Sequence, residues 1–275
     1  MGQIVTINGK PLECQQEPYL RVGQPPKWRT PIEINGKMVY GVNINGYDYP
    51  PADTGSLLYY PGLPGQGSTI WDRSNQSNHG TLVNATWVRL PSGLPVLNLD
   101  GDDCVTTGQP IIPNTTFTIS IWQKNSETQN FLSTVWSKYL TTAQELAMFY
   151  YGYDAPFLCA GSSAAVPYRV DALANSDLGW HKVTWVNNAG TNTIYVDGVL
   201  SQTRTVNAGP VYGDPANTFA FAFTGNAARL FTLGRGYNDS RYYKGRIALP
   251  QVLNVARTAA QELAKYQQER VFFGV

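Results

Sequence analysis

The sequence predicts an all-β protein built from two antiparallel sheets packed face to face, with a β-hairpin-rich N-terminal arm and a short C-terminal helix. Three observations predict this class. Short apolar runs with period-two alternation recur from about residue 56 onward. Turns containing Gly, Asn or Asp separate these runs. A convincing helical pattern occurs once, near the C-terminus. Many short strands followed by one late helix favour a sandwich.

The clearest strand is Phe117–Ile121, in which Phe117, Ile119 and Ile121 share one face. The runs His181–Val186 and Thr193–Val196 alternate similarly, and Asp197-Gly198 turns the chain into the next strand. In Phe219–Phe223, large and small side chains alternate, as they do in facing layers of a packed sandwich. Two further strands are expected at Thr232–Gly234 and Lys244–Ile247.

The one predicted helix covers residues 259–270. Thr258 precedes it as an N-cap, Glu262 lies in its first turns, and Arg270 is basic at its end. The apolar tail Val271–Val275 should be buried somewhere.

The predicted arm, residues 1–55, differs from the predicted main domain, residues 56–275. Three Asn-Gly pairs follow an Ile within alternating runs, at positions 8–9, 35–36 and 45–46. Asn-Gly favours two-residue type I′ hairpins. Pro25-Pro26 interrupts any continuous ladder. The arm is too short for a core of its own, so it either wraps the main domain or docks on a partner.

Composition restricts the function classes. Charged residues make up 14% of the chain, against about 25% in an average protein, which is typical of an extracellular or virion-surface β protein. A net charge of +1 offers no field for a polyanion, so we expect no nucleic-acid binding. Apolar runs are too short for a membrane span. The first 14 residues do not resemble a secretory signal, so either a signal was removed or the protein reaches the outside by particle assembly and lysis.

Cysteines do not suggest a disulfide framework. The chain has three, Cys14, Cys104 and Cys159, and an odd number cannot pair completely. Cys104 and Cys159 lie in apolar surroundings and are expected to be small buried side chains.

Residues 56–265 resemble the laminin-G-like, concanavalin A-like lectin family in motif order and spacing. The turn Trp71–Leu82 is similar to the family's D-x-S-G-N-x-N-H-G-T-L, and Leu97–Val105 is similar to L-x-F-D-G-x-D-x-V. Further segments follow in the family's order: Phe117–Trp122, Gly179–Thr184, Ile194–Gly198, Leu233–Arg235, Gly245–Ile247 and Asn254–Thr258. The resemblance implies a jelly-roll sandwich, with hairpin turns at Asp100-Gly101 and Asp197-Gly198.

The resemblance also implies a structural calcium ion, which members of this fold often hold through loop oxygens. Oxygen-rich candidates are Asp72, Asn75, Asn78, Asp100, Asp102 and Asp103. The alternative is that each merely closes its own turn. No other cofactor is expected. Where the family has an acidic G-x-I-D-E, this chain has Gly245-Arg246-Ile247-Ala248-Leu249.

Catalysis is not expected. Jelly-roll glycosidases place two carboxylates on one strand, yet between residues 56 and 255 the only glutamates are Glu127 and Glu145, neither with an acidic neighbour two or four positions away. His79 and His181 are the only histidines, and we expect both to be structural. Clustered zinc ligands and phosphate-binding glycine loops are absent from the sequence.

Aromatic residues are the remaining signal for a ligand site. The candidate ligand-binding residues are Tyr151, Tyr153, Arg235, Tyr237 and Tyr242. Exposed Tyr beside Arg suits sugar stacking, and equally a protein interface. The alternative is a row of Tyr side chains at a sheet edge that binds nothing.

Together these observations predict a non-catalytic structural or recognition protein on the surface of a virus or phage particle, such as a capsid decoration, spike or tail-associated protein. Residues 1–55 would dock on capsid or other virion proteins, the chain would form a homo-oligomer, and a cell-surface glycan is a further candidate partner. The alternative is a secreted carbohydrate-binding module of a larger enzyme or adhesin.

Overall fold

The computed structural model describes residues 52–61, 68–74, 76–109, 111, 116–126, 134–140, 143–151, 155–160, 168–171, 178–189, 191–204, 230–236 and 242–275, and the strand residues of the first 51 positions. The chain divides into two units, Met1–Pro51 and Ala52–Val275. The boundary therefore lies four residues before the one expected from the sequence, because residues 52–55 belong to the larger unit. There, the backbone N–H of Asn254 donates to the Gly55 carbonyl oxygen at 2.9 Å.

The described residues of the first unit form three short hairpins. They are formed by β1 (Thr6–Ile7) with β2 (Lys10–Pro11), β3 (Pro31–Ile34) with β4 (Lys37–Tyr40), and β5 (Asn43–Ile44) with β6 (Tyr47–Asp48). In each, the innermost pair brackets one Asn-Gly: Ile7 with Lys10, Ile34 with Lys37, and Ile44 with Tyr47. The three predicted hairpins are confirmed.

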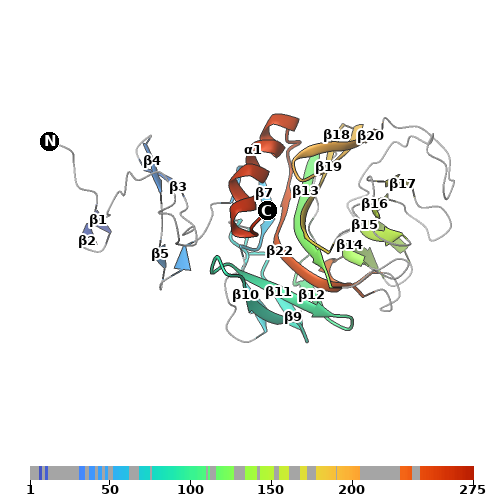
Figure 1. Ribbon diagram of the computed structural model, residues 1–275, viewed down its shortest axis with the longest axis horizontal. Coiled ribbons are helices and arrows are strands. Elements are labelled where there is room, and N and C mark those ends of the chain that lie inside the picture. Colours follow the sequence, from blue (N-terminus) through green and yellow to red (C-terminus); the bar gives the residue numbers. More distant parts are fainter. Residues whose placement is uncertain are drawn as a thin grey trace. The chain divides into compact units, whose positions relative to one another are not determined.

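The second unit is a sandwich of two antiparallel sheets (Figure 1). In the described residues, the first sheet has the order β10 (Thr86–Arg89), β11 (Pro95–Asp100), β22 (Lys244–Leu253), β13 (Phe117–Asn125), β18 (Trp180–Asn188), β19 (Thr191–Val196) and β20 (Val199–Arg204), with β7 (Ser56–Tyr59) pairing the far part of β22. The second sheet has the order β17 (Tyr168–Asp171), β16 (Ala155–Ala160), β15 (Ala143–Tyr151), β14 (Thr134–Leu140), β21 (Leu230–Leu233), β12 (Cys104–Thr107), β9 (Gly80–Val83) and β8 (Thr69–Ile70). The predicted all-β jelly-roll class is confirmed.

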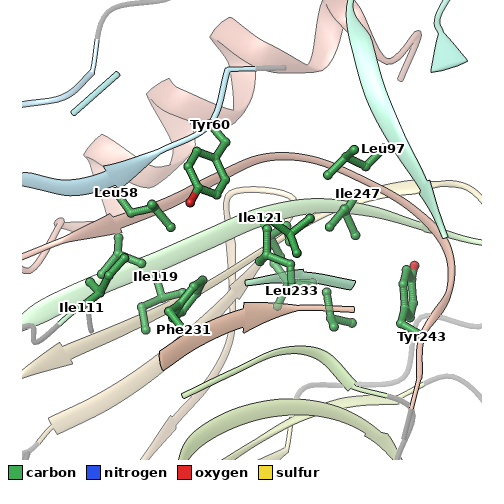
Figure 2. Close-up of a cluster of buried hydrophobic side chains, with 14 of the residues drawn as sticks. Leu58, Tyr60, Leu97, Ile111, Ile119, Ile121, Phe231, Leu233, Tyr243 and Ile247 are labelled. Atoms are coloured by element: carbon green, nitrogen blue, oxygen red, sulfur yellow. The ribbon is translucent and has the colours of Figure 1, made fainter. Parts of the chain in front are cut away.

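The core lies between the two sheets, as Figure 2 shows for Ile119, Ile121 and Ile247 of the first sheet and Phe231 and Leu233 of the second. Alternate residues of each strand supply it, because successive side chains in a strand point to opposite faces. Phe117, Ile119 and Ile121 all lie in this core, as the period-two pattern predicted. Cys104 is buried, also as expected.

The other face of β13 is buried as well, which the alternation did not predict. Thr118 and Ser120 are 0% and 3% exposed. The Thr118 hydroxyl donates to the Val255 carbonyl oxygen at 2.8 Å and accepts the Arg257 N–H at 3.0 Å. The segment after β22 therefore folds back over the outer face of the first sheet, and polar side chains on that face bond to it rather than to water.

Helix α1 (Ala259–Glu269) lies on this outer face, beside β7, β13 and β22 (Figure 1). It begins at a capping box, in which Thr258 and Gln261 satisfy each other's backbone N–H groups. The predicted helix is confirmed, and its last turn continues as the 3₁₀ helix η2 (Arg270–Phe272). The buried residues of α1 are all charged: Glu262, Lys265 and Glu269.

An ionic layer of three cations and three anions joins α1 to the first sheet and to the start of the unit. Its members are Lys182, Arg257 and Lys265 with Asp53, Glu262 and Glu269. Lys182 Nζ lies 3.0 Å from Glu269 Oε2, and Arg257 Nη1 lies 3.0 Å from Glu262 Oε1. Asp53 accepts from both Arg257 and Lys265. The layer is charge-balanced, which buried ions require.

The charges in the layer are held by one another. Burial by itself would raise the pKa of Glu269, but the ammonium groups of Lys182 and Lys265 lower it below its ordinary value. The same balance applies at Asp53, where Lys265 and Arg257 overcome burial and lower the pKa of the carboxyl. Both carboxylates are therefore ionised in the folded protein at neutral pH.

Aromatic stacking completes this contact. Trp122 of β13 stacks against Tyr266 and Phe273, with ring centroids 5.6 Å and 4.0 Å away, and its indole N–H donates to Glu269 Oε2 at 2.7 Å. The predicted burial of the apolar tail is therefore confirmed in part. Phe272 and Phe273 are buried, whereas Val271 and Val275 remain about two-fifths exposed, at 41% and 42%.

Two predicted hairpin turns had different outcomes. Asp197 and Gly198 have φ angles of +54° and +74° and join β19 to β20 as a hairpin, as predicted. The hairpin predicted at Asp100-Gly101 was wrong. β11 pairs with β10 and β22, whereas β12 pairs with β9 and β21, so this turn carries the chain from one sheet to the other. The predicted strand Phe219–Phe223 lies outside the described residues.

Gly245 is expected to tolerate no side chain. Its φ is +155°, and a Cβ there would lie 2.3 Å from the Lys124 carbonyl oxygen and 2.7 Å from the Tyr243 hydroxyl. We expect Gly245→Ala to lower the free energy of unfolding by at least about 2 kcal/mol, measured by chemical denaturation. Gly93→Ala is the control, because Gly93 also has a positive φ, +88°, but open space around it. Equal losses in the two variants would contradict a steric cause at Gly245.

The Lys182–Glu269 pair is expected to be costly to break and cheap to replace. Glu269→Gln or Lys182→Met alone leaves an unpaired buried charge and should lower the free energy of unfolding by about 3 kcal/mol. The double variant removes both charges and should recover more than half of the summed loss, measured as a double-mutant cycle by urea denaturation. Additive losses would show that the two groups do not act as a pair.

Candidate recognition surface

The loop that follows β8 is held closed by Asp72. Oδ1 of Asp72 accepts the backbone N–H groups of Tyr59 at 2.8 Å and Ser74 at 2.9 Å. Oδ2 accepts the Ser74 hydroxyl at 2.6 Å and the Asn78 N–H at 2.8 Å. Asp72 is 5% exposed, and its carboxylate accepts four hydrogen bonds. Three of them come from the loop itself and one from β7, so Asp72 both closes the loop and joins it to β7.

Asn78 adds a second tie between the same loop and β7. The side-chain amide N–H of Asn78 donates to the Leu57 carbonyl oxygen at 2.7 Å, and the backbone carbonyl oxygen of Asn78 accepts the Tyr60 hydroxyl at 2.7 Å. Asp72 and Asn78 therefore close the loop, and their predicted calcium role stays a prediction. Asn75, the third candidate in this loop, lies outside the described residues.

This closed loop presents a tryptophan that the sequence did not single out. Trp71 is 39% exposed, and its ring meets His79 edge-on, with centroids 4.7 Å apart and an interplanar angle of 70°. His79 is fixed in turn, because its Nδ1 accepts the Asp72 N–H at 3.1 Å. The available signal was the alternation through Thr69, Ile70 and Trp71, which turns Trp71 outward once Ile70 is buried.

The turn between β11 and β12 gathers three carboxyl groups. One ligand atom each from Asp100, Asp102 and Asp103 lies within 4.8 Å of the others. A hydrogen bond with Asp100 raises the pKa of Asp102, and burial, together with the Asp100 charge, raises that of Asp103. Asp103 is 3% exposed and accepts the backbone N–H of Asp100. Three closely spaced carboxyl groups offer the oxygen ligands that a hard divalent cation prefers, and the turn brings the candidates Asp100, Asp102 and Asp103 together.

The predicted aromatic ligand site is only partly visible. Arg235 and Tyr242 face each other across an isolated antiparallel bridge, and both are half-buried. The Arg235 carbonyl oxygen accepts the Ser137 hydroxyl at 2.8 Å. Tyr151 ends β15, where only the backbone is described, while Tyr153 and Tyr237 lie outside the described residues. The five candidates are therefore not shown to form one site.

A polar hollow of about 410 Å³ lies between the first residues of the second unit and the loop closed by Asp72. It is lined by residues 52–57, Ser74, Gln76 and Asn254. Its single ionisable side chain is Asp53, which is engaged with Arg257 and Lys265. The hollow therefore lacks the pair of acids that glycoside hydrolysis requires.

The second histidine also has a structural partner. His181 Nδ1 lies 2.7 Å from Asp197 Oδ2, and Asp197 Oδ1 accepts the Lys182 N–H at 2.9 Å. These bonds fix the hairpin between β19 and β20 to β18. No helix in the described residues is long and apolar enough to cross a membrane.

Three solved structures with a similar fold are one domain of an enzyme and two toxin binding domains. Domain 4 of an extracellular arabinanase from Geobacillus stearothermophilus, solved with arabinotriose, aligns with a TM-score of 0.57 at 17% identity, over 76% of this chain and 97% of that domain. The botulinum neurotoxin serotype D binding domain aligns with a TM-score of 0.58 at 12% identity, over 78% of this chain and 52% of that one. The binding domain of Paraclostridial Mosquitocidal Protein 1 aligns with a TM-score of 0.56 at 11% identity, over 76% and 52%. The chain thus spans about half the length of these toxin domains, and at such identities the likeness shows the fold alone.

No curated protein matches the sequence significantly. A family model does match, over residues 99–261, and its description is the concanavalin A-like lectin/glucanases superfamily, in the laminin G-like group. The matched segment runs from the end of β11 to the first turn of α1 and covers more than half of the chain. The motif resemblance and the two-sheet jelly roll are in agreement with it, and the chain belongs to the concanavalin A-like lectin/glucanases superfamily.

Proposed function

We propose that this protein is a non-catalytic recognition protein displayed on the surface of a virus or phage particle, with the lectin-like jelly roll facing outward and the unit formed by residues 1–51 docking on the particle. The observation that carries the proposal is the division of the chain. A sandwich with its own core follows a separate unit made of short hairpins.

The acidic side chains support a role without catalysis. Among the residues whose side chains the structure describes, the carboxylates of Asp53, Glu262 and Glu269 belong to the ionic layer, and Asp72 and Asp197 close turns. The remaining three, Asp100, Asp102 and Asp103, share one turn within 4.8 Å of one another. Glycosidases instead hold two carboxyl groups about 5–9.5 Å apart across a sugar-binding groove.

The N-terminal unit supports a docking role. Its hairpins have two to four residues per strand, and an isolated two-stranded hairpin is marginally stable in water. Such hairpins gain stability when a partner surface buries their apolar residues, as a docking arm would. The low charge content of the chain, 14%, is in keeping with a particle surface.

A second candidate function is a carbohydrate-binding module of a larger secreted enzyme or adhesin. The arabinanase domain favours it, because the alignment covers 97% of a domain that was solved with a bound trisaccharide. In this alternative the jelly roll still recognises a ligand, but residues 1–51 would connect modules rather than dock on a particle.

Removal of residues 1–51 separates the two functions. We expect the full chain to sediment as a homo-oligomer and residues 52–275 to sediment as a monomer with an unchanged unfolding midpoint, because the core lies wholly in the second unit. Analytical ultracentrifugation and thermal denaturation measure both. A monomeric full chain would contradict the docking role, as would a gene neighbourhood without portal, protease and major capsid genes.

A calcium ion is proposed at the turn that holds Asp100, Asp102 and Asp103. Calcium at 100 times its dissociation constant should add about 2.7 kcal/mol to the free energy of unfolding. Asp102→Asn should abolish that gain without harming the metal-free protein, since Asp102 is exposed and its charge crowds Asp100. Magnesium, which demands tighter octahedral geometry, is the control ion. An unfolding curve that calcium leaves unchanged in the wild-type chain would refute the site.

A further inference from the structure

The outward face of three strands at one edge of the second sheet carries an unusual set of side chains. Ile70 of β8, Leu82 of β9 and Val105 of β12 point into the core. Their neighbours along each strand therefore point away from the core. Six of these outward positions lie at one end of the three strands or one residue beyond it: Thr69, Trp71, His79, Thr81, Thr106 and Gly108. Val83, which is 42% exposed, follows Thr81 on the same face of β9.

Strand register arranges the six positions in two parallel rows. Thr69 pairs with Thr81, and Thr81 pairs with Thr106, which gives a row of hydroxyl groups across three strands. One step further along, Trp71 contacts His79, and the backbone N–H of Gly108 donates to the His79 carbonyl oxygen at 3.3 Å. This second row consists of two rings followed by a glycine. We call the six positions the Trp71 platform.

The Trp71 platform is accessible. Trp71 is 39% exposed, Thr81 and Gly108 are exposed, and Thr69, His79 and Thr106 are half-buried. A Cβ added at Gly108 would meet only the His79 carbonyl oxygen, at 3.8 Å. The glycine therefore leaves an open notch at the end of the ring row, beside His79.

The ring row is also held in place before any ligand arrives. His79 Nδ1 accepts the Asp72 N–H, so the neutral ring carries its proton on Nε2, which is then a donor. Asp72 is fixed by the four hydrogen bonds that close the loop. A rigid aromatic surface binds with little loss of conformational entropy.

We propose that the Trp71 platform binds a neutral saccharide, with a sugar ring stacked on Trp71 and its hydroxyl groups bonded to the threonine row and to His79 Nε2–H. This inference rests on the proposed recognition function and names its ligand class. A sugar ring has an apolar C–H face and a rim of hydroxyls, which match a ring row beside a hydroxyl row. The six positions carry no charged side chain, so they favour a neutral sugar over a sialylated one.

The size of the platform favours a saccharide over a protein. Two interstrand steps of about 4.8 Å make it about 10 Å wide. A stable protein interface buries about 800 Å² on each partner around an apolar centre. Trp71 is instead surrounded by threonine, histidine and glycine, and the exposed residues of its own loop, Arg73, Gln76 and Ser77, are polar.

The test is titration calorimetry of the full chain against arabinotriose, xylotriose, cellotriose and maltotriose, with a sialylated trisaccharide as the charged comparison. We expect at least one neutral trisaccharide to bind, and the sialylated one to bind more weakly. Trp71→Ala should weaken binding about tenfold, the loss of one aromatic contact. Thr81→Val, which keeps the shape and removes the hydroxyl, should weaken it about fivefold. Trp71→Phe should retain most of the affinity.

Val199→Ala is the matched control, because it removes a 63% exposed apolar side chain from the first sheet. It should leave the affinity unchanged, and unfolding curves should confirm that every variant is folded. Failure of every neutral trisaccharide to bind would overturn the platform, even if residues 1–51 still drive oligomerisation as proposed above. Saccharide binding that survives Trp71→Ala and Thr81→Val would overturn it too, by placing the ligand elsewhere. If the full chain is monomeric and these variants lose saccharide binding, the platform is supported and only the display on a particle is refuted.

Discussion

The arrangement of this jelly roll depends on the charge-balanced ionic layer under its C-terminal helix. Lys182 of β18, Arg257 and Lys265 face Asp53, Glu262 and Glu269, so the layer joins the beginning of the second unit, the middle of the first sheet and the last helix. Removing one partner would leave a buried charge uncompensated. The six side chains come from three distant parts of the chain, at residue 53, residue 182 and residues 257–269, and their pairing fixes where α1 lies.

Covering the first sheet has a consequence for recognition. Because α1 and Phe273 bury the outer face around Trp122, that part of the first sheet cannot meet a ligand. At the β8, β9 and β12 edge of the second sheet, the outward residues Trp71, Thr81 and Gly108 are exposed. The two sheets thus differ: α1 covers the outer face of the first sheet around Trp122, whereas this edge of the second sheet carries exposed polar and aromatic residues.

Asp72 shows how one residue can support such a surface without touching a ligand. Its carboxylate draws the loop onto β7, and its backbone N–H fixes the His79 ring against Trp71. The sequence singled out Asp72 as an oxygen-rich residue, and the resemblance suggested a metal ligand. The four donors around it explain the same residue as the organiser of the loop.

Local patterns by themselves determined much of this protein: the period-two strands, the Asn-Gly hairpins, the Thr258 cap and the family motifs all depend on neighbours a few residues apart. They failed where the outcome depended on distant contacts. Glu262, Lys265 and Glu269 have the pattern of a solvated helix face, yet they are buried because Lys182 and Asp53 arrive from distant parts of the chain and Arg257 packs beside them. The Asp100-Gly101 turn joins two sheets because the partners of β11 and β12 come from elsewhere in the sequence. Likewise, only strand register could place Trp71 beside His79 and Thr81 beside Thr69 and Thr106, since a surface made of three strands does not exist until the sheet has formed.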